Sequence, residues 1–457
     1  MASLVVASNR GPLSFARDDT GALTARRGAG GLVAVLGPAL VDQDAVWVSA
    51  AISEEDREAA AQGLTEADGF RWRALVSDRD TYRMFYDVVA NATLWFMHHG
   101  LFDLPRRPRI DRRWRDAWTA YREVNYAFAD AISEEADDGA TVLVHDYHLA
   151  LVGAGLATAR PDLHTIHFNH TPFCPPAGLR VLPADVANEL LSGLAGFGAC
   201  GFHSARWAGE FENCAREVLG NAPPTFVSPA ATDHDDIAKV AASEDCAREL
   251  ASLDELVGDR SFIVRVDRIE LSKNLLRGFL AFDDLLQTRP EWRGRVVFGA
   301  FVYPSRESLV EYLAYHQEVE ALARRINETW ATPDWTPIIL DTADYFPRSC
   351  AALRRYDVLL VNPVRDGLNL VAKEGALLNE RNGVLALSRE TGVWEELEGG
   401  ALDVNPFDVA GTADVLADAL AMDNDERVQR ARVLRDAAAQ RTPHDWLADQ
   451  LRAAQTR

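Results

Sequence analysis

The basic residues of this chain are almost all arginines. It contains three lysines against forty-four arginines, and two of the lysines, Lys273 and Lys373, lie in polar segments. A lysine ammonium is a compact point charge and an arginine guanidinium is a rigid planar fork, so the two are not interchangeable beside a crowded phosphate. Lysine scarcity alone is equally consistent with an arginine-rich composition. Together with the residues around them, the two lysines indicate parts of one anion-binding site.

The second half of the chain places cations after apolar runs. Arg268 and Lys273 follow the run 262–266 and could bracket a diphosphate. Arg306 follows the run 295–301 and offers a further anion contact. In folds with parallel strands, ligands bind beyond the carboxyl ends of the strands. These loops are therefore the first place to expect an anionic ligand.

A second polar segment combines carboxylates with a lysine. Asp366-Gly-Leu-Asn-Leu-Val-Ala-Lys-Glu374 follows the apolar run 358–362 and predicts the opening of a helix. The N-terminal amides of a helix favour an anion, and Glu374 returns to roughly the same helical face two turns after Asp366. Sugar hydroxyls need acceptors and phosphates need donors, so the pattern suits a ligand that carries both.

The first half of the chain offers a similar but weaker set. Arg10 ends the first expected strand, and Gly30 and Gly31 lie in a glycine-rich turn before an apolar helix. Glycines let backbone N–H groups approach an anion, although most such turns are only turns. Asp146 and His170 stand at the ends of two later strands, where each alone could merely cap the next helix. Together, on neighbouring parallel strands, they predict a crevice for a polyhydroxyl ligand.

Short β-rich runs alternate with longer helical patterns along most of the chain. Many of the runs are continuously apolar, as in strands buried on both faces. This alternation predicts parallel sheets covered by helices. The expected strands are 4–8, 46–50, 82–86, 141–145, 165–169, 199–203 and 226–229, then 262–266, 295–301, 337–340, 358–362, 384–388 and 401–405, and the expected helices include 114–135, 205–219, 274–286 and 307–326.

The length of the chain predicts two domains. At 457 residues it exceeds what one hydrophobic core usually serves. The polar, proline-containing stretch 228–236 is the expected seam. We therefore predict an α/β protein with two Rossmann-like, doubly wound domains that face each other across a cleft, the first at 1–228 and the second at 229–440.

Composition excludes several classes of partner. A net charge of −22 argues against nucleic acid or an anionic membrane. The five cysteines are odd in number, widely spaced and without a C-x-x-C pair, so neither a disulfide framework nor a zinc site is expected. There is no apolar stretch near the ~20 residues that cross a bilayer, and no basic segment precedes the first apolar run. We expect a cytoplasmic protein without a metal site.

Six motifs in order resemble one known family, the trehalose-6-phosphate synthases of glycosyltransferase family 20. They are Ser8-Asn-Arg-Gly-Pro12, Gly30-Gly31, Val144-His-Asp-Tyr-His-Leu149, His170-Thr-Pro-Phe173, Arg268 with Ser272-Lys273, and Arg365-Asp-Gly-Leu-Asn-Leu-Val-Ala-Lys-Glu374. The resemblance runs from about Leu4 to Trp446, and the segment 265–274 looks like the actinobacterial branch. It implies a retaining glycosyltransferase of the GT-B fold, with a C-terminal helix within 441–457 that crosses back to the first domain.

The resemblance also implies roles for individual residues. A nucleotide-glucose donor would lie on the second domain and the acceptor, glucose 6-phosphate, on the first. Arg268, Lys273, Asp366 and His170 would take part in catalysis, with His170 near the 6-hydroxyl of the donor sugar. The donor would further contact Gly30, Gly31, Gly367, Leu368, Asn369, Leu370, Val371 and Glu374, and the acceptor would contact Arg10, Tyr86, Asp146 and Arg306.

In this family the leaving phosphate takes the acceptor proton on the same face of the sugar. The resemblance therefore implies no covalent protein intermediate, no metal and no other cofactor. It leaves a homo-oligomer open as an assembly.

Three departures from the family pattern bear on specificity. Ala50 stands where a stacking tryptophan is usual, the segment 229–233 is altered, and Asn274 replaces a common glycine. The actinobacteria-like segment 265–274 and the altered segment 229–233 predict GDP-glucose in preference to UDP-glucose as the donor, whereas Ala50 bears on the choice of acceptor.

Two other functions remain open on the sequence. A pseudo-glycosyltransferase would couple a nucleotide-cyclitol to an amino-cyclitol phosphate, but its known examples weaken the motif that is intact at 365–374. A catalytically inactive sugar-phosphate-binding homologue would not need Arg268, Lys273, Asp366 and Glu374 together.

Overall fold

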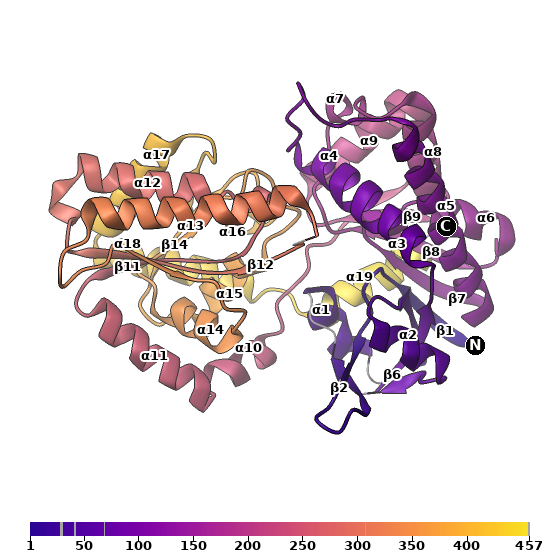
Figure 1. The fold of residues 1–457 in the computed structure, drawn as a ribbon, viewed down its shortest axis with the longest axis horizontal. Coiled ribbons are helices and arrows are strands. Elements are labelled where there is room, and N and C mark those ends of the chain that lie inside the picture. The colour runs from indigo at the N-terminus through magenta and orange to yellow at the C-terminus, as the bar shows by residue number, and fades with distance from the viewer. Residues whose placement is uncertain (28–30, 41–42, 68, 307, 456–457) are drawn as a thin grey trace. The chain divides into compact units, whose positions relative to one another are not determined.

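The chain forms two compact units, each built on its own parallel sheet (Figure 1). The computed structural model describes residues 1–27, 31–40, 43–67, 69–306 and 308–455. Unit 1 comprises Met1–Ala230 with Pro443–Arg457, and unit 2 comprises Ala231–Thr442. The expected domain limits, after residues 228 and 440, each lie two residues before these boundaries. The predicted α/β class with two doubly wound domains is confirmed.

Unit 1 has a sheet whose first strand lies near the middle. The strand order is β10-β9-β8-β7-β1-β4-β6-β5, and every pair is parallel except β5 with β6. From β1 the chain first adds β4, β6 and β5 on one side of the sheet and then adds β7 to β10 on the other side. The strand order therefore reverses between β1 and β7. The strands are β1 (Ala2–Ala7), β4 (Ala45–Ala50), β5 (Glu66–Ala67), β6 (Phe70–Leu75), β7 (Ala136–His145), β8 (His164–Asn169), β9 (Ala199–Phe202) and β10 (Thr225–Val227), beside the hairpin β2 (Leu13–Arg17) and β3 (Leu23–Arg27).

The central strands of unit 1 are buried on both faces. Val5, Val6, Val142 and Val144 have no exposed surface. Burial of one such side chain contributes about 1.5–3 kcal/mol. The register places Ala7 of β1 beside Val144 of β7, so the residues that follow these two strands leave the sheet at the same level.

Helices cover both faces of this sheet, and one of them corrects a sequence-based expectation. Residues 82–86 were expected to form a strand but are helical. The side chain of Asp78 accepts from the backbone amides of Asp80 and Thr81 and starts the helix. The helices are α1 (Gly31–Leu40), α2 (Glu54–Ala61), α3 (Arg79–Arg83), η1 (Met84–Trp95), α4 (Phe96–His99), α5 (Arg112–Glu135), η2 (Tyr147–Leu149), α6 (Val152–Ala159), α7 (Pro176–Leu179), α8 (Ala184–Ala195) and α9 (Ala205–Leu219).

The C-terminal helix α19 (Pro443–Gln455) belongs to unit 1. Its Trp446 is fully buried, and the indole Nε1 donates to the carbonyl oxygen of Ser228 at 3.1 Å. Asp449 accepts from the Ser228 hydroxyl at 2.8 Å. The helix is thus part of the unit 1 core, although unit 2 separates it from the rest of unit 1 in the sequence.

Unit 2 repeats the same plan with six parallel strands. Their order is β13-β12-β11-β14-β15-β16, so the order reverses between β11 and β14. Helices α12 and α13 cover one face of the sheet and α11 and α14 the other (Figure 1). The strands are β11 (Ser261–Ile269), β12 (Val296–Pro304), β13 (Ile338–Asp341), β14 (Val358–Val361), β15 (Val384–Ser388) and β16 (Leu402–Val404).

One helix of unit 2 begins later than expected. The helix expected at 307–326 is α13, which begins at Val310, and Arg306 before it takes a positive φ of 47°. The helices are α10 (His234–Ala241), α11 (Glu244–Val257), η3 (Leu271–Lys273), α12 (Leu275–Thr288), η4 (Pro290–Trp292), α13 (Val310–Trp330), α14 (Phe346–Arg355), α15 (Leu370–Leu378), α16 (Trp394–Leu397), α17 (Val409–Ala421) and α18 (Asn424–Ala438).

All five cysteines are buried thiols. Within the described ranges, we find no helix that combines the length and the low charge needed to cross a bilayer.

Candidate active site

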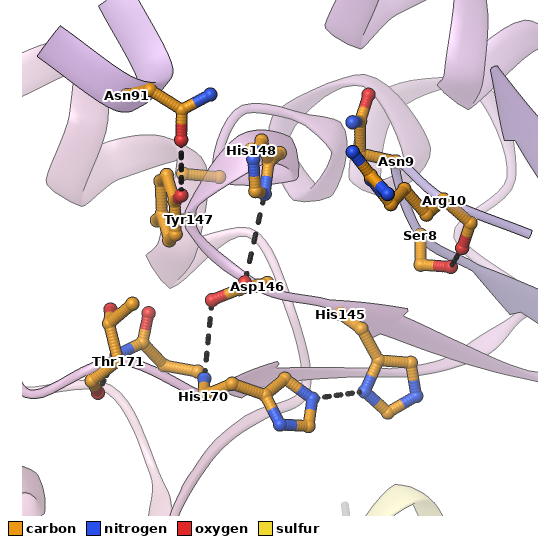
Figure 2. A network of polar contacts seen from close by, with 12 residues as sticks. Ser8, Asn9, Arg10, Asn91, His145, Asp146, Tyr147, His148, His170 and Thr171 are labelled. Atoms are coloured by element: carbon orange, nitrogen blue, oxygen red, sulfur yellow. Dashed lines mark hydrogen bonds and ion pairs between the residues drawn. The ribbon is translucent and has the colours of Figure 1, made fainter. Parts of the chain in front are cut away.

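The polar residues of unit 1 gather where the strand order reverses. Arg10 follows β1, and Asp146 follows β7, the neighbouring strand. Open α/β sheets bind their ligands at such a switch point, beyond the carboxyl ends of the strands. Arg10 is exposed, and its carbonyl oxygen accepts from the Ser8 hydroxyl at 2.6 Å, which shapes the turn after β1 (Figure 2).

Asp146 has a backbone conformation that side chains rarely adopt. Its φ is 75° and its ψ is 162°, a region populated almost only by glycine, at a cost of about 1–3 kcal/mol for other residues. The carboxylate oxygen Oδ1 accepts from the backbone N–H of His170 at 3.3 Å, and Oδ2 lies 3.7 Å from Nδ1 of His148 (Figure 2). The surrounding contacts therefore hold a strained carboxylate at the switch point.

Aromatic rings line the same end of the sheet. Tyr86 stacks on Tyr82, with ring centroids 5.6 Å apart, and on His148, with centroids 5.7 Å apart. The Tyr82 hydroxyl donates to Asn9 Oδ1 at 3.2 Å, which ties this stack to the turn after β1. Burial raises the pKa of Tyr82 above its usual range, so its hydroxyl stays protonated.

Position 50, where the family usually has a tryptophan, is an alanine here, but Trp47 of the same strand is present. Trp47 of β4 is buried, and its Nε1 donates to the Ser8 hydroxyl at 2.8 Å. Ala50 ends the same strand and is also buried. Trp47 therefore supports the turn that carries Arg10.

His170 lies against two other histidines. Its Nε2 is 3.1 Å from Nδ1 of His145, and its Nδ1 is 3.3 Å from Nε2 of His203. Burial lowers the pKa of His170 to about 3. The His170 ring is therefore neutral throughout the physiological range.

In unit 2 the corresponding switch point is strongly charged. Lys273 lies in η3 after β11, and its Nζ is 2.7 Å from Asp366 Oδ2 and 3.3 Å from Asp267 Oδ1. Burial by itself lowers the pKa of Lys273, but these two carboxylates outweigh it and hold the pKa above its usual range. The ammonium is permanently charged and nearly enclosed.

A buried arginine fixes the loop that carries Lys273. Arg265 is fully buried; it donates to Asp267 Oδ2 at 3.1 Å and also to Asn362 Oδ1 and the carbonyl oxygen of Lys273. The next residue, Asn274, takes the left-handed conformation, with φ 62° and ψ 40°. Asparagine tolerates this region better than most side chains, which explains how it can replace the glycine common in the family.

Glu270 joins the two arginines of this end of the sheet. It accepts from Arg268 Nη1 at 2.9 Å and from Arg306 Nη1 at 3.1 Å. The Glu270 side chain is 2% exposed and the Arg268 side chain is 45% exposed. The nearby glutamate raises the pKa of Arg268. Arg306, which the resemblance assigned to the acceptor, therefore lies in unit 2 beside Arg268.

The Asp366 loop opens a helix, as its residue pattern predicted. Asn369 caps α15: its Oδ1 accepts from the backbone N–H of Ala372 at 3.1 Å, and its Nδ2 donates to Asp366 Oδ2 at 3.1 Å. Leu370 and Val371 are the first residues of α15, so their amides lie in its N-terminal turn. Gly367 and Leu368 are buried between Asp366 and the cap.

Two residues of α15 face different surroundings. Burial raises the pKa of Glu374 to about 7, so its carboxyl is partly protonated near neutral pH. Lys373 forms an ion pair with Glu396, 2.7 Å from Nζ to Oε2. The two lysines that the sequence grouped into one site thus have different partners, and Lys373 is part of a separate ion pair.

Comparison with known proteins decides the family. The profile of glycosyltransferase family 20 matches residues 2–456. The chain belongs to this family.

Known proteins resemble this chain over nearly all of its length. The bifunctional trehalose-6-phosphate synthase/phosphatase of Thermoproteus tenax is 32% identical over 98% of the chain, which spans 62% of that relative. The E. coli trehalose-6-phosphate structure bound with UDP-2-fluoro glucose superimposes with a TM-score of 0.85 at 27% identity, covering 99% of each chain. The UDP-forming α,α-trehalose-phosphate synthase of Burkholderia xenovorans, in complex with glucose-6-phosphate, gives a TM-score of 0.84 at 28% identity, covering 99% of this chain and 100% of that one.

The family-20 residues predicted from the sequence fall into two sets. Unit 1 contains Arg10, Tyr86, Asp146, His170 and Gly31, the first residue of α1. Unit 2 contains Arg268, Lys273, Arg306, Asp366, Gly367, Leu368, Asn369, Leu370, Val371 and Glu374. Gly30 lies outside the described residues.

Sequence reasoning missed the acids that hold the cations. Asp267 and Glu270 flank Arg268 in the sequence, and a carboxylate on either side of a site arginine was a usable signal. His203 was also missed, because it is distant in the sequence from His145 and His170. Among the described residues, no cluster of three or more histidine, cysteine or acidic side chains is arranged to hold a metal ion.

Proposed function

We propose that this chain transfers glucose from a nucleotide-glucose to glucose 6-phosphate and so forms α,α-trehalose 6-phosphate. The observation that carries the proposal is the charged switch point of unit 2, in a chain matched from residue 2 to residue 456 by family 20. Lys273 and Arg268 are cations set among acids, and a leaving nucleoside diphosphate needs such charge as it departs.

The donor would bind to unit 2 in this proposal. Lys273 and Arg268 would contact its diphosphate together with the first amides of α15, which favour an anion. Asp366 and Asn369 would accept from and donate to the sugar hydroxyls. Because Asp366 now holds Lys273, binding of a diphosphate would share that ammonium between the carboxylate and the new phosphate oxygens.

The acceptor would bind to unit 1, with Arg10 on its phosphate, Asp146 accepting from a hydroxyl and Tyr86 against the ring. We further propose that the reaction needs no metal, because cationic side chains can stabilise the departing diphosphate without one. Activity that survives excess EDTA would support this, and activity restored only by added Mg²⁺ would contradict it.

The donor base needs a direct measurement. The sequence departures predicted GDP-glucose, but relatives whose names include the released nucleotide are UDP-forming. These names do not support a GDP preference, and UDP-glucose is the first donor to assay.

The deciding experiment is a panel of donors and acceptors. The purified chain is incubated with UDP-glucose or GDP-glucose and with glucose 6-phosphate or free glucose, and both the released nucleotide and the disaccharide phosphate are quantified. We expect trehalose 6-phosphate from glucose 6-phosphate and little product from free glucose. Transfer only to an amino-cyclitol phosphate would favour the pseudo-glycosyltransferase, and binding without transfer would favour the inactive homologue.

A further inference from the structure

Three histidines of unit 1 form a continuous series of hydrogen bonds that ends at a backbone amide. His203 follows β9, His170 follows β8, and His145 ends β7. His145 and His203 are buried. The indole of Trp446 packs beside all three, with ring centroids 5.7–6.3 Å from theirs. Each histidine comes from a different strand, so the sheet itself sets their spacing.

The backbone amide of Ala230 determines the donor and the acceptor in each hydrogen bond along the three histidines. The backbone N–H of Ala230 lies 3.3 Å from His203 Nδ1, and a backbone N–H can only donate. His203 Nδ1 therefore accepts, which an imidazolium cannot do, and His203 is neutral with its proton on Nε2.

The same reasoning passes along the chain. His203 Nε2–H donates to His170 Nδ1 at 3.3 Å, so His170 carries its proton on Nε2. His170 Nε2–H in turn donates to His145 Nδ1 at 3.1 Å, which leaves the His145 proton on Nε2. That last nitrogen is buried and has no hydrogen-bond partner in the described part of the protein. One backbone amide thus selects the tautomers of three side chains.

We propose that His203 and His145 are positioning residues that hold His170 as the neutral tautomer with its proton on Nε2. The Nε2–H of His170 is donated to His145, so His170 carries neither a positive charge nor a free lone pair at that atom, and a substrate oxygen that approaches it can only accept. An incoming oxygen would compete with His145 for this proton. The role toward a substrate rests on the proposed function, whereas the tautomer assignment rests on the geometry alone.

The test combines NMR with kinetics on the full-length protein. A long-range ¹H–¹⁵N spectrum of ¹⁵N-histidine-labelled protein separates protonated from unprotonated ring nitrogens. His99 and His167 provide internal references of opposite kind. The Nδ1 of His99 lies 2.8 Å from the carbonyl oxygen of Trp95, and the Nε2 of His167 lies 3.0 Å from that of Asp146. We expect the spectrum to show the His170 ring protonated on Nε2, as in His167, and not on Nδ1, as in His99.

Two substitutions at one position separate positioning from packing. His203→Phe keeps a ring against Trp446 but removes the donor to His170, whereas His203→Gln keeps an N–H donor near the Nε2 position. We expect the Phe variant to mix the His170 tautomers and to lower kcat/KM about tenfold, the value of one hydrogen bond. The Gln variant should restore the tautomer and most of the activity. His316→Phe, on α13 of unit 2, is the matched control and should change neither.

Three outcomes would overturn the proposal: a wild-type His170 protonated on Nδ1, an unchanged His170 tautomer in His203→Phe, or no tautomer rescue by Gln. If the Phe variant does not fold, the wild-type spectrum and the Gln variant still decide. If the protein transfers no glucose, the proposed function fails, but the NMR result still tests the tautomer chain.

Discussion

The two switch points of this protein share one topology but differ in their electrostatics. In unit 1 the order reverses between β1 and β7, and the residues there are a strained carboxylate, stacked rings and neutral histidines. In unit 2 the strand order reverses between β11 and β14. Four charged groups there form ion pairs with one another, Lys273 with Asp366 and Arg268 with Glu270. The first arrangement offers a ligand shape and directed hydrogen bonds. The second offers it charge.

The largest expected effect lies at the charged switch point. Lys273→Ala removes an ammonium from between two carboxylates, so kcat/KM for transfer should fall by roughly 10²–10³, the loss seen when one charge-stabilising donor is removed. Lys239→Ala, on exposed α10, is the control and should retain activity. Steady-state kinetics with saturating donor measure the effect. Near-normal turnover in the Lys273 variant would remove the basis for assigning charge stabilisation to unit 2.

A smaller effect is expected for the exposed cation of unit 1. Arg10→Ala should raise the KM for glucose 6-phosphate about ten- to a hundredfold, because a charge-assisted hydrogen bond to phosphate contributes about 1.5–3 kcal/mol. Arg17→Ala, in the neighbouring hairpin, should leave this KM unchanged. Arg306→Ala should instead affect the donor, because Arg306 and Arg268 share Glu270. A fall in donor affinity alone for Arg10→Ala would show that the two units had been assigned to the wrong substrates.

The buried carboxyl of α15 predicts a pH dependence of stability. Burial raises the pKa of Glu374 to about 7, above its usual value near 4.5, so the folded protein binds more protons than the unfolded chain between these values. The free energy of unfolding should therefore fall as pH rises from about 5 to 7, by about 1–3 kcal/mol. Glu374→Gln should flatten this slope in urea titrations. An identical slope in both proteins would mean that Glu374 titrates normally.

The smallest expected effect is on stability and arises from the backbone strain at Asp146. Both Asp146→Ala and Asp146→Gly remove the carboxylate, but only glycine relaxes a φ of 75° with a ψ of 162°. The glycine variant should therefore be more stable than the alanine variant by about 1–2 kcal/mol, measured by chemical denaturation. Both should lose acceptor affinity to a similar degree. Equal stabilities would show that the protein does not store strain at this carboxylate.

Elements with a clear local pattern of apolar residues could be predicted from the sequence. Strands such as β1 and β11 are apolar runs buried on both faces, and local pattern identifies them. Lys273 and Asp366 were predicted together because each follows such a run. The helix at 79–95 was missed because its residues are rich in aromatics and β-branched side chains, which also favour strands. Only the Asp78 cap distinguishes the two.

Contacts distant in the sequence were beyond local pattern. Glu270 also accepts from Arg306, which follows the neighbouring strand, and no spacing rule links Arg306 to the nearby pair of Arg268 and Glu270. The chain from Ala230 through His203 to His145 depends on the order of β7, β8 and β9. The pairing of Lys373 with Glu396 likewise reflects how α15 packs, which the amphipathic pattern does not specify.

The return of α19 to unit 1 has a consequence for synthesis. Trp446 and Asp449 complete contacts with Ser228, yet all of unit 2 lies between these residues in the chain. Translation proceeds at about 5–20 residues per second, so on the order of ten to forty seconds separate the emergence of Ser228 from that of its partners. During that interval the face that Trp446 covers stays open, which makes nascent unit 1 a candidate for chaperone binding, whereas unit 2 emerges as one uninterrupted piece.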